Sequence, residues 1–313
     1  MAAEGDNNFV RYIYRGEDGE HIPFHATHII VREDVTVVLA EAFYEHPNII
    51  EVVCHDKVEK IGEEAFYWCW NLRRVIMPGV KIVEERAFNW CGLTDVECDN
   101  LEIIEEKAFQ NCGSLRRINL PSAEIVEEKA FNCCGALTDV KFGNKLERID
   151  RGAFRNCSLE RITIPLKDGI FTDDNIFQAC QDLSHVHLVE GAAIHETIAA
   201  LQLEEWRKDI NEEIDSINQI LPDTNAGKCD EFDDAYDDDV SGKARAIRGW
   251  IRSVLFKIAH YKGEHQSLLD EAATTLHHAL PCDIVMKNIL PLLQLPSYMR
   301  AYSLGGEDHE DDD

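Results

Sequence analysis

The chain has 313 residues, 31 of them basic and 59 acidic, and its formal net charge at pH 7 is −28. A charge of that sign repels nucleic acids and anionic membrane surfaces at long range, so we expect no nucleic-acid partner. Hydrophobic residues make up 45% of the sequence, which is enough to build a large core.

Residues 1–8 are expected to be disordered. They carry neither the basic start nor the apolar run of a signal peptide. No apolar stretch of the sequence reaches transmembrane length. We therefore expect an intracellular protein, located in the cytoplasm, that does not insert into membranes.

Residues 9–31 are predicted to form an N-terminal cap. Tyr12–Tyr14, a turn at Glu17–Gly19 and His21–Ile22 have the pattern of a short hairpin, and a further strand is predicted at His28–Val31. An array of repeats needs such a cover, because an open terminal strand is an edge that recruits other chains.

Residues 32–189 repeat themselves with a period of 21–23 residues. The mark of each repeat is an Ala-Phe pair: Ala42-Phe43, Ala65-Phe66, Ala87-Phe88, Ala108-Phe109, Ala130-Phe131, Ala153-Phe154 and a degenerate copy, Ile176-Phe177. Each pair is followed by a phrase of the type Leu72-x-x-Val75-x-Met77, whose alternation is typical of a half-buried strand. A period of this length indicates a solenoid with one parallel strand per repeat, in which neighbouring units share a continuous core.

A second column follows the phenylalanines at a fixed distance of three residues: His46, Cys69, Cys91, Cys112, Cys134, Cys157 and Cys180. This periodicity explains most of the eleven cysteines as small buried hydrophobes. Cys133 and Cys134 are then expected to point to opposite sides, one exposed and one buried. We predict that the thiols are structural, since the spacing of a zinc site is absent and an odd number argues against a complete set of disulfides.

The phrase I-x-x-x-A-F-x-x-C-x-x-L-x-x-I-x-L-P resembles the BspA-like subclass of leucine-rich repeat proteins. The chain as a whole resembles such proteins of unicellular algae, through Tyr12-Ile13-Tyr14 near its start and Glu205-Trp206-Arg207 and His260-Tyr261-Lys262 in its tail. The resemblance implies an α/β fold: a leucine-rich repeat solenoid of about seven repeats with an N-terminal cap and a C-terminal helical bundle. It also implies a binding module for other macromolecules, with no enzymatic residues to carry over.

Beyond the repeats the composition predicts a helical domain at 194–300, an acidic loop within it at about 222–242, and an acidic tail at 301–313. Helical periodicity places Trp206, Ile210 and Ile214 on one face of a helix that ends before Pro222.

A longer helix is predicted from about Lys243 to Leu280, and a shorter one from Asp283 to Leu293. At 1.5 Å per residue the helix before Pro222 reaches only about half the length of the longer one. The third helix or a partner helix is therefore expected to cover the remainder.

We predict no catalytic, metal or cofactor site. The acidic loop lacks the glycine and the final glutamate of an EF-hand. His185 and His187 share one face of a strand and could hold an ion, but no third ligand stands at a suitable spacing. Phosphate-binding glycine loops and the G-x-S-x-G and H-E-x-x-H motifs are absent from the sequence.

The outward positions of the predicted strands form two columns on the expected concave face. The first alternates in charge from repeat to repeat: Glu51, Arg74, Asp95, Arg117, Asp139, Arg161 and His185. The second is mixed: Val53, Ile76, Glu97, Asn119, Lys141, Thr163 and His187. Strands about 4.8 Å apart would let each charge of the first column neutralise its neighbours. The face is then either a self-satisfied charge ladder or a surface that holds a protein partner through polar contacts near Arg74 and Ile76.

The sequence therefore predicts a non-enzymatic protein–protein interaction module or scaffold that uses the concave face. An alternative is an adaptor that acts through the helical domain, because residues 280–293 resemble the opening helix of an F-box. An enzyme is a third alternative without a supporting motif. The identity of the partner and the oligomeric state are left open by the sequence.

Overall fold

The structure is a computed structural model that describes residues 9–201, 203–217 and 242–279. The described residues form two compact units. The first contains the repeats up to Val189 and the start of the last helix, up to Arg252. The second contains residues 190–215 and the rest of that helix from Ser253.

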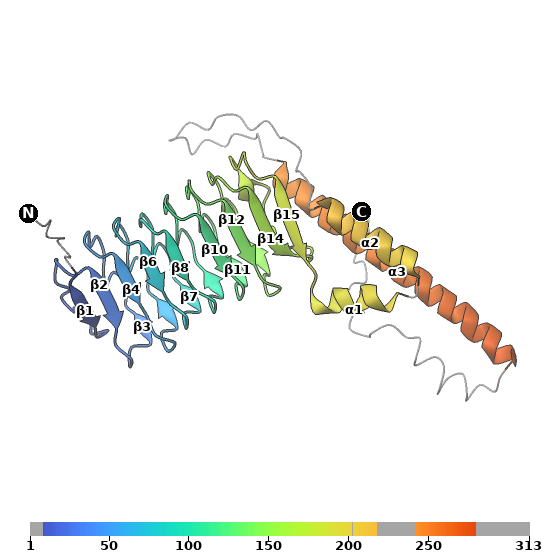
Figure 1. The fold of residues 1–313 in the computed structure, drawn as a ribbon, viewed down its shortest axis with the longest axis horizontal. Coiled ribbons are helices and arrows are strands. Elements are labelled where there is room, and N and C mark those ends of the chain that lie inside the picture. Colours follow the sequence, from blue (N-terminus) through green and yellow to red (C-terminus); the bar gives the residue numbers. More distant parts are fainter. Residues whose placement is uncertain (1–8, 202, 218–241, 280–313) are drawn as a thin grey trace, which may run out of the picture. The chain divides into compact units, whose positions relative to one another are not determined.

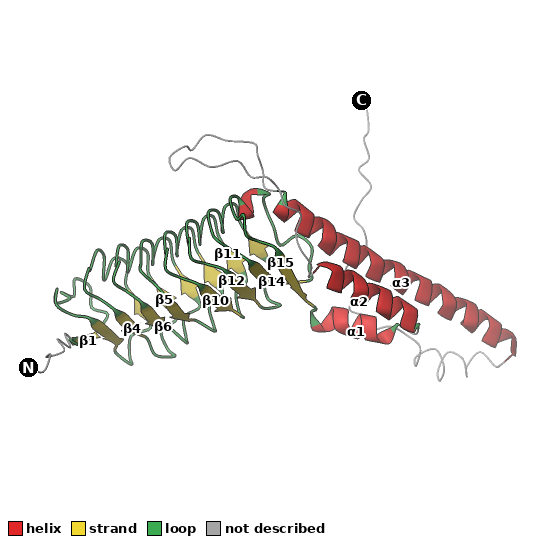
Figure 2. Ribbon diagram, turned by 45° about the horizontal axis from the view of Figure 1, so that its top comes forward, coloured by secondary structure: helices red, strands yellow, loops and turns green. Residues whose placement is uncertain are grey.

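The repeats form a solenoid in which each coil carries a longer strand and the coils from β2 to β12 also carry a shorter one (Figures 1 and 2). The longer strands form two parallel sheets. The first sheet, β1-β2-β4-β6-β8, comprises β1 (Arg11–Tyr14), β2 (His28–Val31), β4 (Glu51–Val53), β6 (Arg74–Ile76) and β8 (Asp95–Glu97). The second sheet, β10-β12-β14-β15, comprises β10 (Arg117–Leu120), β12 (Asp139–Phe142), β14 (Arg161–Pro165) and β15 (His185–Val189). The predicted solenoid with parallel strands is thus confirmed.

The shorter strands pair in a third parallel sheet, which the sequence did not predict. It comprises β3 (Val37–Val38), β5 (Lys60–Ile61), β7 (Ile82–Val83), β9 (Ile103–Ile104), β11 (Ile125–Val126) and β13 (Arg148–Ile149). The second residue of each strand is buried and the first is half-buried. Two residues are too few to show the alternation by which a strand is recognised in sequence.

The predicted N-terminal hairpin is wrong. β1 pairs with β2 in parallel, with Tyr12 beside Ile29, and His21–Ile22 are not in a strand. The turn before them is present, but the side chain of Glu20 takes the place of a second strand: its carboxylate accepts hydrogen bonds from the backbone N–H of Arg15 at 2.9 Å and the hydroxyl of Tyr12 at 2.8 Å. The N-terminal segment therefore continues the solenoid as a parallel strand.

The phenylalanines of the repeats form one stacked column inside the solenoid, as predicted. The six successive ring-centroid distances from Phe43 to Phe177 are 4.8, 5.1, 5.2, 5.2, 5.3 and 6.0 Å. Interplanar angles stay between 2° and 13°, and every one of these rings is buried. Offset stacking of this kind adds to the hydrophobic gain of burying the rings.

The alanine that precedes each phenylalanine has a role in the spacing of the coils. The N–H of Phe66 donates to the carbonyl oxygen of Ala87 on the next coil at 2.8 Å, and Phe88 does the same to Ala108. These alanines are fully buried. A small side chain here lets successive coils approach closely enough for both the backbone hydrogen bond and the ring stack.

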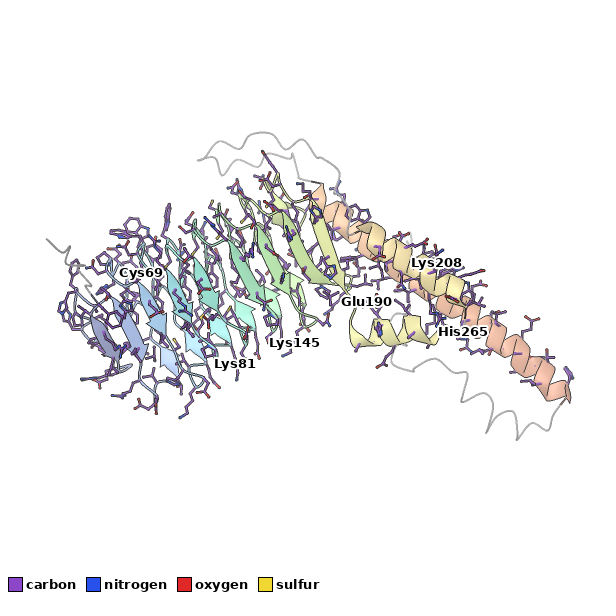
Figure 3. The ribbon with its side chains drawn as sticks, viewed as in Figure 1. Cys69, Lys81, Lys145, Glu190, Lys208 and His265 are labelled. Atoms are coloured by element: carbon purple, nitrogen blue, oxygen red, sulfur yellow. The ribbon has the colours of Figure 1, made fainter. Side chains whose placement is uncertain are left out.

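The cysteine column is also confirmed, and each thiol has an acceptor. Cys69, labelled in Figure 3, donates to the carbonyl oxygen of Phe43 at 3.1 Å, and Cys112 donates to that of Phe88 at 3.2 Å. Cys134 is fully buried, and its neighbour Cys133 is half-buried rather than exposed. All nine described cysteines are free thiols.

The last coil contains the short helix η1 (Asn175–Phe177) and is covered by the first turns of α3 (Lys243–Ala279). Lys243 is buried, and its ammonium group donates to the carbonyl oxygens of Cys180, Gln181 and Leu183 at 2.7, 2.8 and 3.0 Å. Without these acceptors the buried charge would be strongly destabilising.

Ion pairs add to the contact between the last coil and the start of α3. Arg248 pairs with Asp174, and Arg252 pairs with Asp168 at 3.1 Å. The degenerate seventh repeat is therefore part of the stack, and residues from α3 close its end.

The second unit contains α1 (Ala192–Ala200), α2 (Glu204–Ile217) and most of α3. The ring of Trp206 stacks on that of Tyr261 with centroids 5.3 Å apart. Lys257 bridges Asp209 and Glu213 of α2 at 3.1 and 3.0 Å. The predicted helix from about Lys243 to Leu280 is thus confirmed as α3.

Among the described helices, none combines the length and the apolar character that crossing a bilayer requires.

Candidate functional site

The two predicted outward columns lie on the face of the longer strands, which we call the strand face. The register within the first sheet sets Glu51 beside Arg74, and Arg74 beside Asp95. Within the second sheet it sets Arg117 beside Asp139, and Asp139 beside Arg161. Central residues such as Val75 and Ile118 point inward and are buried, so the residues on either side of them face outward.

Between the two columns, as far as the structure describes the chain, opposite charges form ion pairs around Arg74 alone. Its guanidinium lies 3.6 Å from the carboxylate of Glu51, 3.2 Å from that of Asp95 and 2.6 Å from that of Glu97. All four side chains are substantially exposed, so these ion pairs add little to stability. Val53 and Ile76, both half-buried, provide the apolar part of this half of the face.

The alternating charge ladder is interrupted between β8 and β10. These strands belong to separate sheets, so Asp95 and Arg117 are not paired in register. Val96 in β8 is half-buried, whereas its counterparts Val75 and Ile118 are buried. Although β8 and β10 are in contact, no ion pair joins Asp95 to Arg117 within the described chain, so the expected neutralisation is not seen at this point.

The second half of the strand face is basic. Within the described chain, Arg117 and Lys141 form no ion pair, and Arg161 pairs only with its neighbour Glu160 at 3.9 Å. Asp139 is the single acidic residue of the two columns here, and its Oδ1 atom is buried without a hydrogen-bond partner among the described residues. Asn119 and Thr163 add neutral hydrogen-bonding groups. A patch of this charge is unexpected in a chain with a net charge of −28.

A hollow of about 280 Å³ lies at the C-terminal end of the basic half. Its lining comes from two neighbouring strands: Arg161, Ile162, Thr163, His185, Val186 and His187. His185 and His187 stand beside Arg161 and Thr163 in register. Among the described residues, no group of three or more potential metal ligands comes together here or elsewhere.

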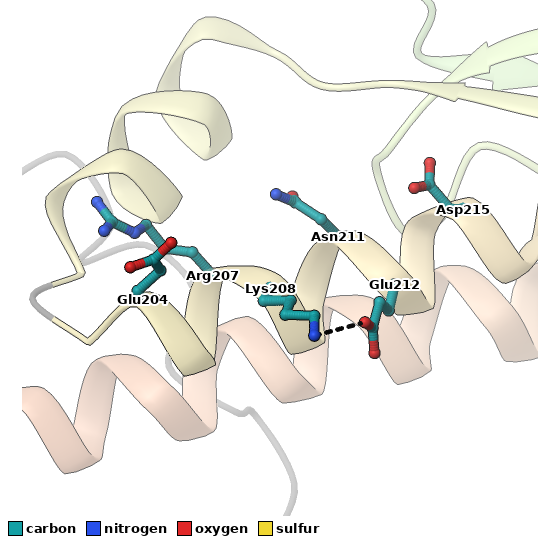
Figure 4. Close-up of a pocket in the computed structure, with 6 residues that line it drawn as sticks. All are labelled: Glu204, Arg207, Lys208, Asn211, Glu212 and Asp215. Atoms are coloured by element: carbon teal, nitrogen blue, oxygen red, sulfur yellow. Dashed lines mark ion pairs between the residues drawn. The ribbon is translucent and has the colours of Figure 1, made fainter.

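A larger hollow of about 460 Å³ lies in the second unit along one face of α2 (Figure 4). Its lining residues are polar and belong to this one helix: Glu204, Arg207, Lys208, Asn211, Glu212 and Asp215. Lys208 and Glu212 are joined by an exposed ion pair of 3.6 Å. This hollow does not bring together groups from different elements, whereas a small-molecule site needs polar groups that converge on the ligand.

Several predictions concern residues outside the described part of the chain. These are the disorder of residues 1–8, most of the acidic loop at 222–242, the F-box-like helix at 280–293 and the acidic tail at 301–313.

The stacked coils with one longer parallel strand each define a leucine-rich repeat protein. The family pattern described as BspA type Leucine rich repeat region matches residues 36–125 and 102–199, in six copies. These matches together span just over half of the sequence, and the chain belongs to this family, whose members are generally binding modules and typically not enzymes.

Solved structures of leucine-rich repeat proteins are similar to parts of the chain. One from Bacteroides ovatus is 28% identical with a TM-score of 0.41, over 46% of this chain and 42% of that one. A leucine rich cell surface protein from Faecalibacterium prausnitzii is 25% identical with a TM-score of 0.45, over 59% of this chain and 51% of that one. This chain thus spans about half, or less, of the length of these two proteins. No curated protein matches the sequence.

Proposed function

We propose that this protein is a non-enzymatic interaction module whose strand face holds a segment of another protein. The single observation that carries the proposal is the basic half of the face, where Arg117, Lys141 and Arg161 are exposed with almost no acidic partner of their own. Cationic side chains left unneutralised by the fold are available to a ligand. Asn119 and Thr163, in the neighbouring column of the strand face, can hydrogen-bond to the bound segment and fix its register.

The chemistry of the face indicates an acidic or phosphorylated polypeptide as the partner of this half. Arginine donates two parallel hydrogen bonds to carboxylates and phosphates, which gives geometric selectivity as well as attraction. The net negative charge of the rest of the chain opposes binding of long polyanions such as nucleic acids. A short acidic segment that enters only the strand face avoids most of that repulsion.

The first half of the strand face differs and is suited to other contacts. Arg74 is already surrounded by three carboxylates, and Val53 and Ile76 lie beside them in register. A partner that extends along the whole face would place its acidic part over β10–β15 and apolar or basic groups over β4–β8. We infer that this division of charge fixes the direction in which the segment binds.

The test is charge reversal on the face. We expect the double variant Arg117→Glu/Arg161→Glu to lose the partners that wild-type protein retains in affinity capture from cell lysate, with unchanged thermal unfolding. The matched control is Lys57→Glu/Lys145→Glu, which changes the net charge equally at two exposed positions off the strands. Equal retention by wild type and both variants would show that the strand face binds none of the captured proteins.

Binding through the helical domain calls for a different experiment from simple truncation. Removing residues 194–313 would also remove Lys243 and its three hydrogen bonds to the last coil. Loss of a partner after such a truncation could then come from an uncovered solenoid end. Substitutions on the exposed faces of the helices, which leave Lys243 and Arg248 in place, separate the two causes.

A further inference from the structure

Exposed aromatic side chains gather at one place on the repeats, away from the strand face. They lie in the turns that follow the phenylalanines of the first coils, and we call them the aromatic edge: Tyr44, Tyr67, Trp68, Trp70 and Trp90. The three tryptophans are 42%, 54% and 51% exposed, Tyr44 is 40% exposed and Tyr67 is half-buried. Between residues 91 and 189, no large hydrophobic side chain is exposed to this degree.

Three rings of the aromatic edge, those of Tyr44, Tyr67 and Trp68, stack in a row. Tyr44 and Tyr67 stack with centroids 5.1 Å apart and an interplanar angle of 9°. Tyr67 and Trp68 stack at 6.2 Å and 18°. The backbone beneath Trp70 is held by Arg73, whose guanidinium donates to the carbonyl oxygens of Trp70 and Gly92 at 3.1 and 2.7 Å. Ring faces are therefore presented on a fixed support.

The tryptophans occupy backbone positions that do not favour them. Trp68 and Trp90 have φ angles of 58° and 60°, in the left-handed region. The same turn position in later coils holds Asn111 and Asn156, with φ angles of 61° and 57°. Asparagine tolerates this conformation, whereas a bulky residue there is strained.

That strain is not offset by burial, because both tryptophan side chains remain about half exposed. Two later coils carry asparagine at this position, and Glu45, Cys133 and Ala179 occupy it in others, so the fold does not require tryptophan there. Strained residues that the packing does not require are a mark of functional sites. Tryptophan and tyrosine are also the residue types that dominate binding energy at protein interfaces.

Carboxylates rim the aromatic edge. Glu45 is exposed, follows Tyr44 in the chain and donates its backbone N–H to the carbonyl oxygen of Tyr67 at 2.7 Å. Partial desolvation, followed by the carboxylates of Glu45 and Glu64, raises the pKa of Tyr44. Within the described chain, Glu41 and Glu45 form no ion pair, and Arg86 is already engaged with Glu64 and Glu85 at 3.3 and 3.0 Å. Aromatic faces beside carboxylates attract cations, arginine above all.

We propose that the aromatic edge is a second docking surface, which takes an arginine- or lysine-bearing segment of a partner protein. The guanidinium or ammonium groups lie over the rings of Tyr44, Trp68 and Trp90 and pair with Glu45 and Glu41. The net charge of −28 increases the rate of encounter with such a segment. This surface is independent of the strand face, which has the opposite charge preference in its second half.

The test uses a fluorescein-labelled peptide of alternating arginine and glycine as the probe, and a glutamate–glycine peptide for comparison. Trp68→Asn/Trp90→Asn leaves the net charge unchanged, so general attraction to an acidic protein is equal in variant and wild type. We expect fluorescence anisotropy to show that this double variant binds the arginine peptide about tenfold more weakly or worse. Its thermal unfolding midpoint should be equal to or above that of wild type, because asparagine relieves the strain.

Two controls make the result specific. Cys133→Asn places the same residue in the equivalent turn of a later coil and should bind the peptide as wild type does. Arg117→Glu/Arg161→Glu should also retain it, which separates this surface from the proposed function of the strand face. The proposal is overturned if wild type fails to bind the arginine peptide, if the tryptophan variant keeps its affinity for it, or if that variant loses affinity for the glutamate peptide to the same degree.

Discussion

Replacing Phe109 by alanine should lower the free energy of unfolding by about 3–5 kcal/mol. The ring is fully buried and stacks on Phe88 and on Phe131, with both centroid distances 5.2 Å. Its loss removes burial and leaves a cavity in mid-column that neighbouring coils cannot close without breaking their own hydrogen bonds. Guanidinium denaturation followed by circular dichroism measures the change.

Phe24→Ala is the matched control, because that phenylalanine is 69% exposed. We expect it to change the free energy of unfolding by no more than about 0.5 kcal/mol. A similar small effect for Phe109→Ala would mean that the ring column does not form the core of the solenoid.

The second large effect is a loss of stability at alkaline pH. Burial raises the pKa of Cys69 and of Cys112 to about 12, and it raises the pKa of Cys180 well above its usual range. The same thiols in the unfolded chain ionise near pH 8.5, as ordinary cysteines do. Above about pH 8.5 the unfolded chain therefore binds fewer protons than the folded chain, and the free energy of unfolding falls as pH rises toward about 12.

Each buried thiol contributes at most about 1.4 kcal/mol per pH unit to this decrease in the free energy of unfolding. Cysteines other than Cys133 are all buried within the described chain, so together they lower the free energy of unfolding by on the order of 10 kcal/mol between pH 8.5 and 10. Denaturation midpoints at pH 7, 9 and 10 measure it. Cys112→Ala should flatten the dependence by the share of one thiol, whereas a stability that is constant up to pH 10 would place the thiols in contact with solvent.

Sequence periodicity predicts the interior of this protein well because the interior obeys one repeated constraint. Each coil must bury a phenylalanine and a thiol beside those of its neighbours, so the spacing of Phe88, Cys91 and their counterparts survives changes elsewhere. The turns are different. Residues with left-handed φ angles stand two positions before and after the phenylalanines, and apart from Gly152 they are not glycine; Glu64, Arg86 and Trp90 are examples. Turns are recognised in a sequence by residues such as glycine and proline, so the position of these left-handed turns could not be predicted from residue type.

The strand face was predicted residue by residue, but its electrostatics was not. Registers within each sheet follow from the repeat, so the pairing of Arg74 with Asp95 could be foreseen. The interruption between β8 and β10 falls inside the repeat array, where the pattern of residue types continues unchanged. Its consequence is that Arg117 belongs to a basic patch rather than to a neutral ladder.

The aromatic edge shows a further limit of reading a repeat by its period. Trp68 and Trp90 stand at a position where other coils carry Asn111 or Cys133, so they look like ordinary variation between repeats. In the structure the exposure of such large rings at a left-handed position is what distinguishes them. The departure from the repeat consensus, two tryptophans in equivalent turns, was the available signal.

Site-specific photo-crosslinking is the most direct measurement of the claim that the strand face is a binding surface. A benzophenone amino acid is introduced at Asn119 on the face or at Lys145 off it, both exposed, in otherwise intact protein. We expect a crosslinked protein partner from Asn119 and none from Lys145 after irradiation in cell lysate. Crosslinks from Lys145 alone, or no crosslink from Asn119, would contradict that claim.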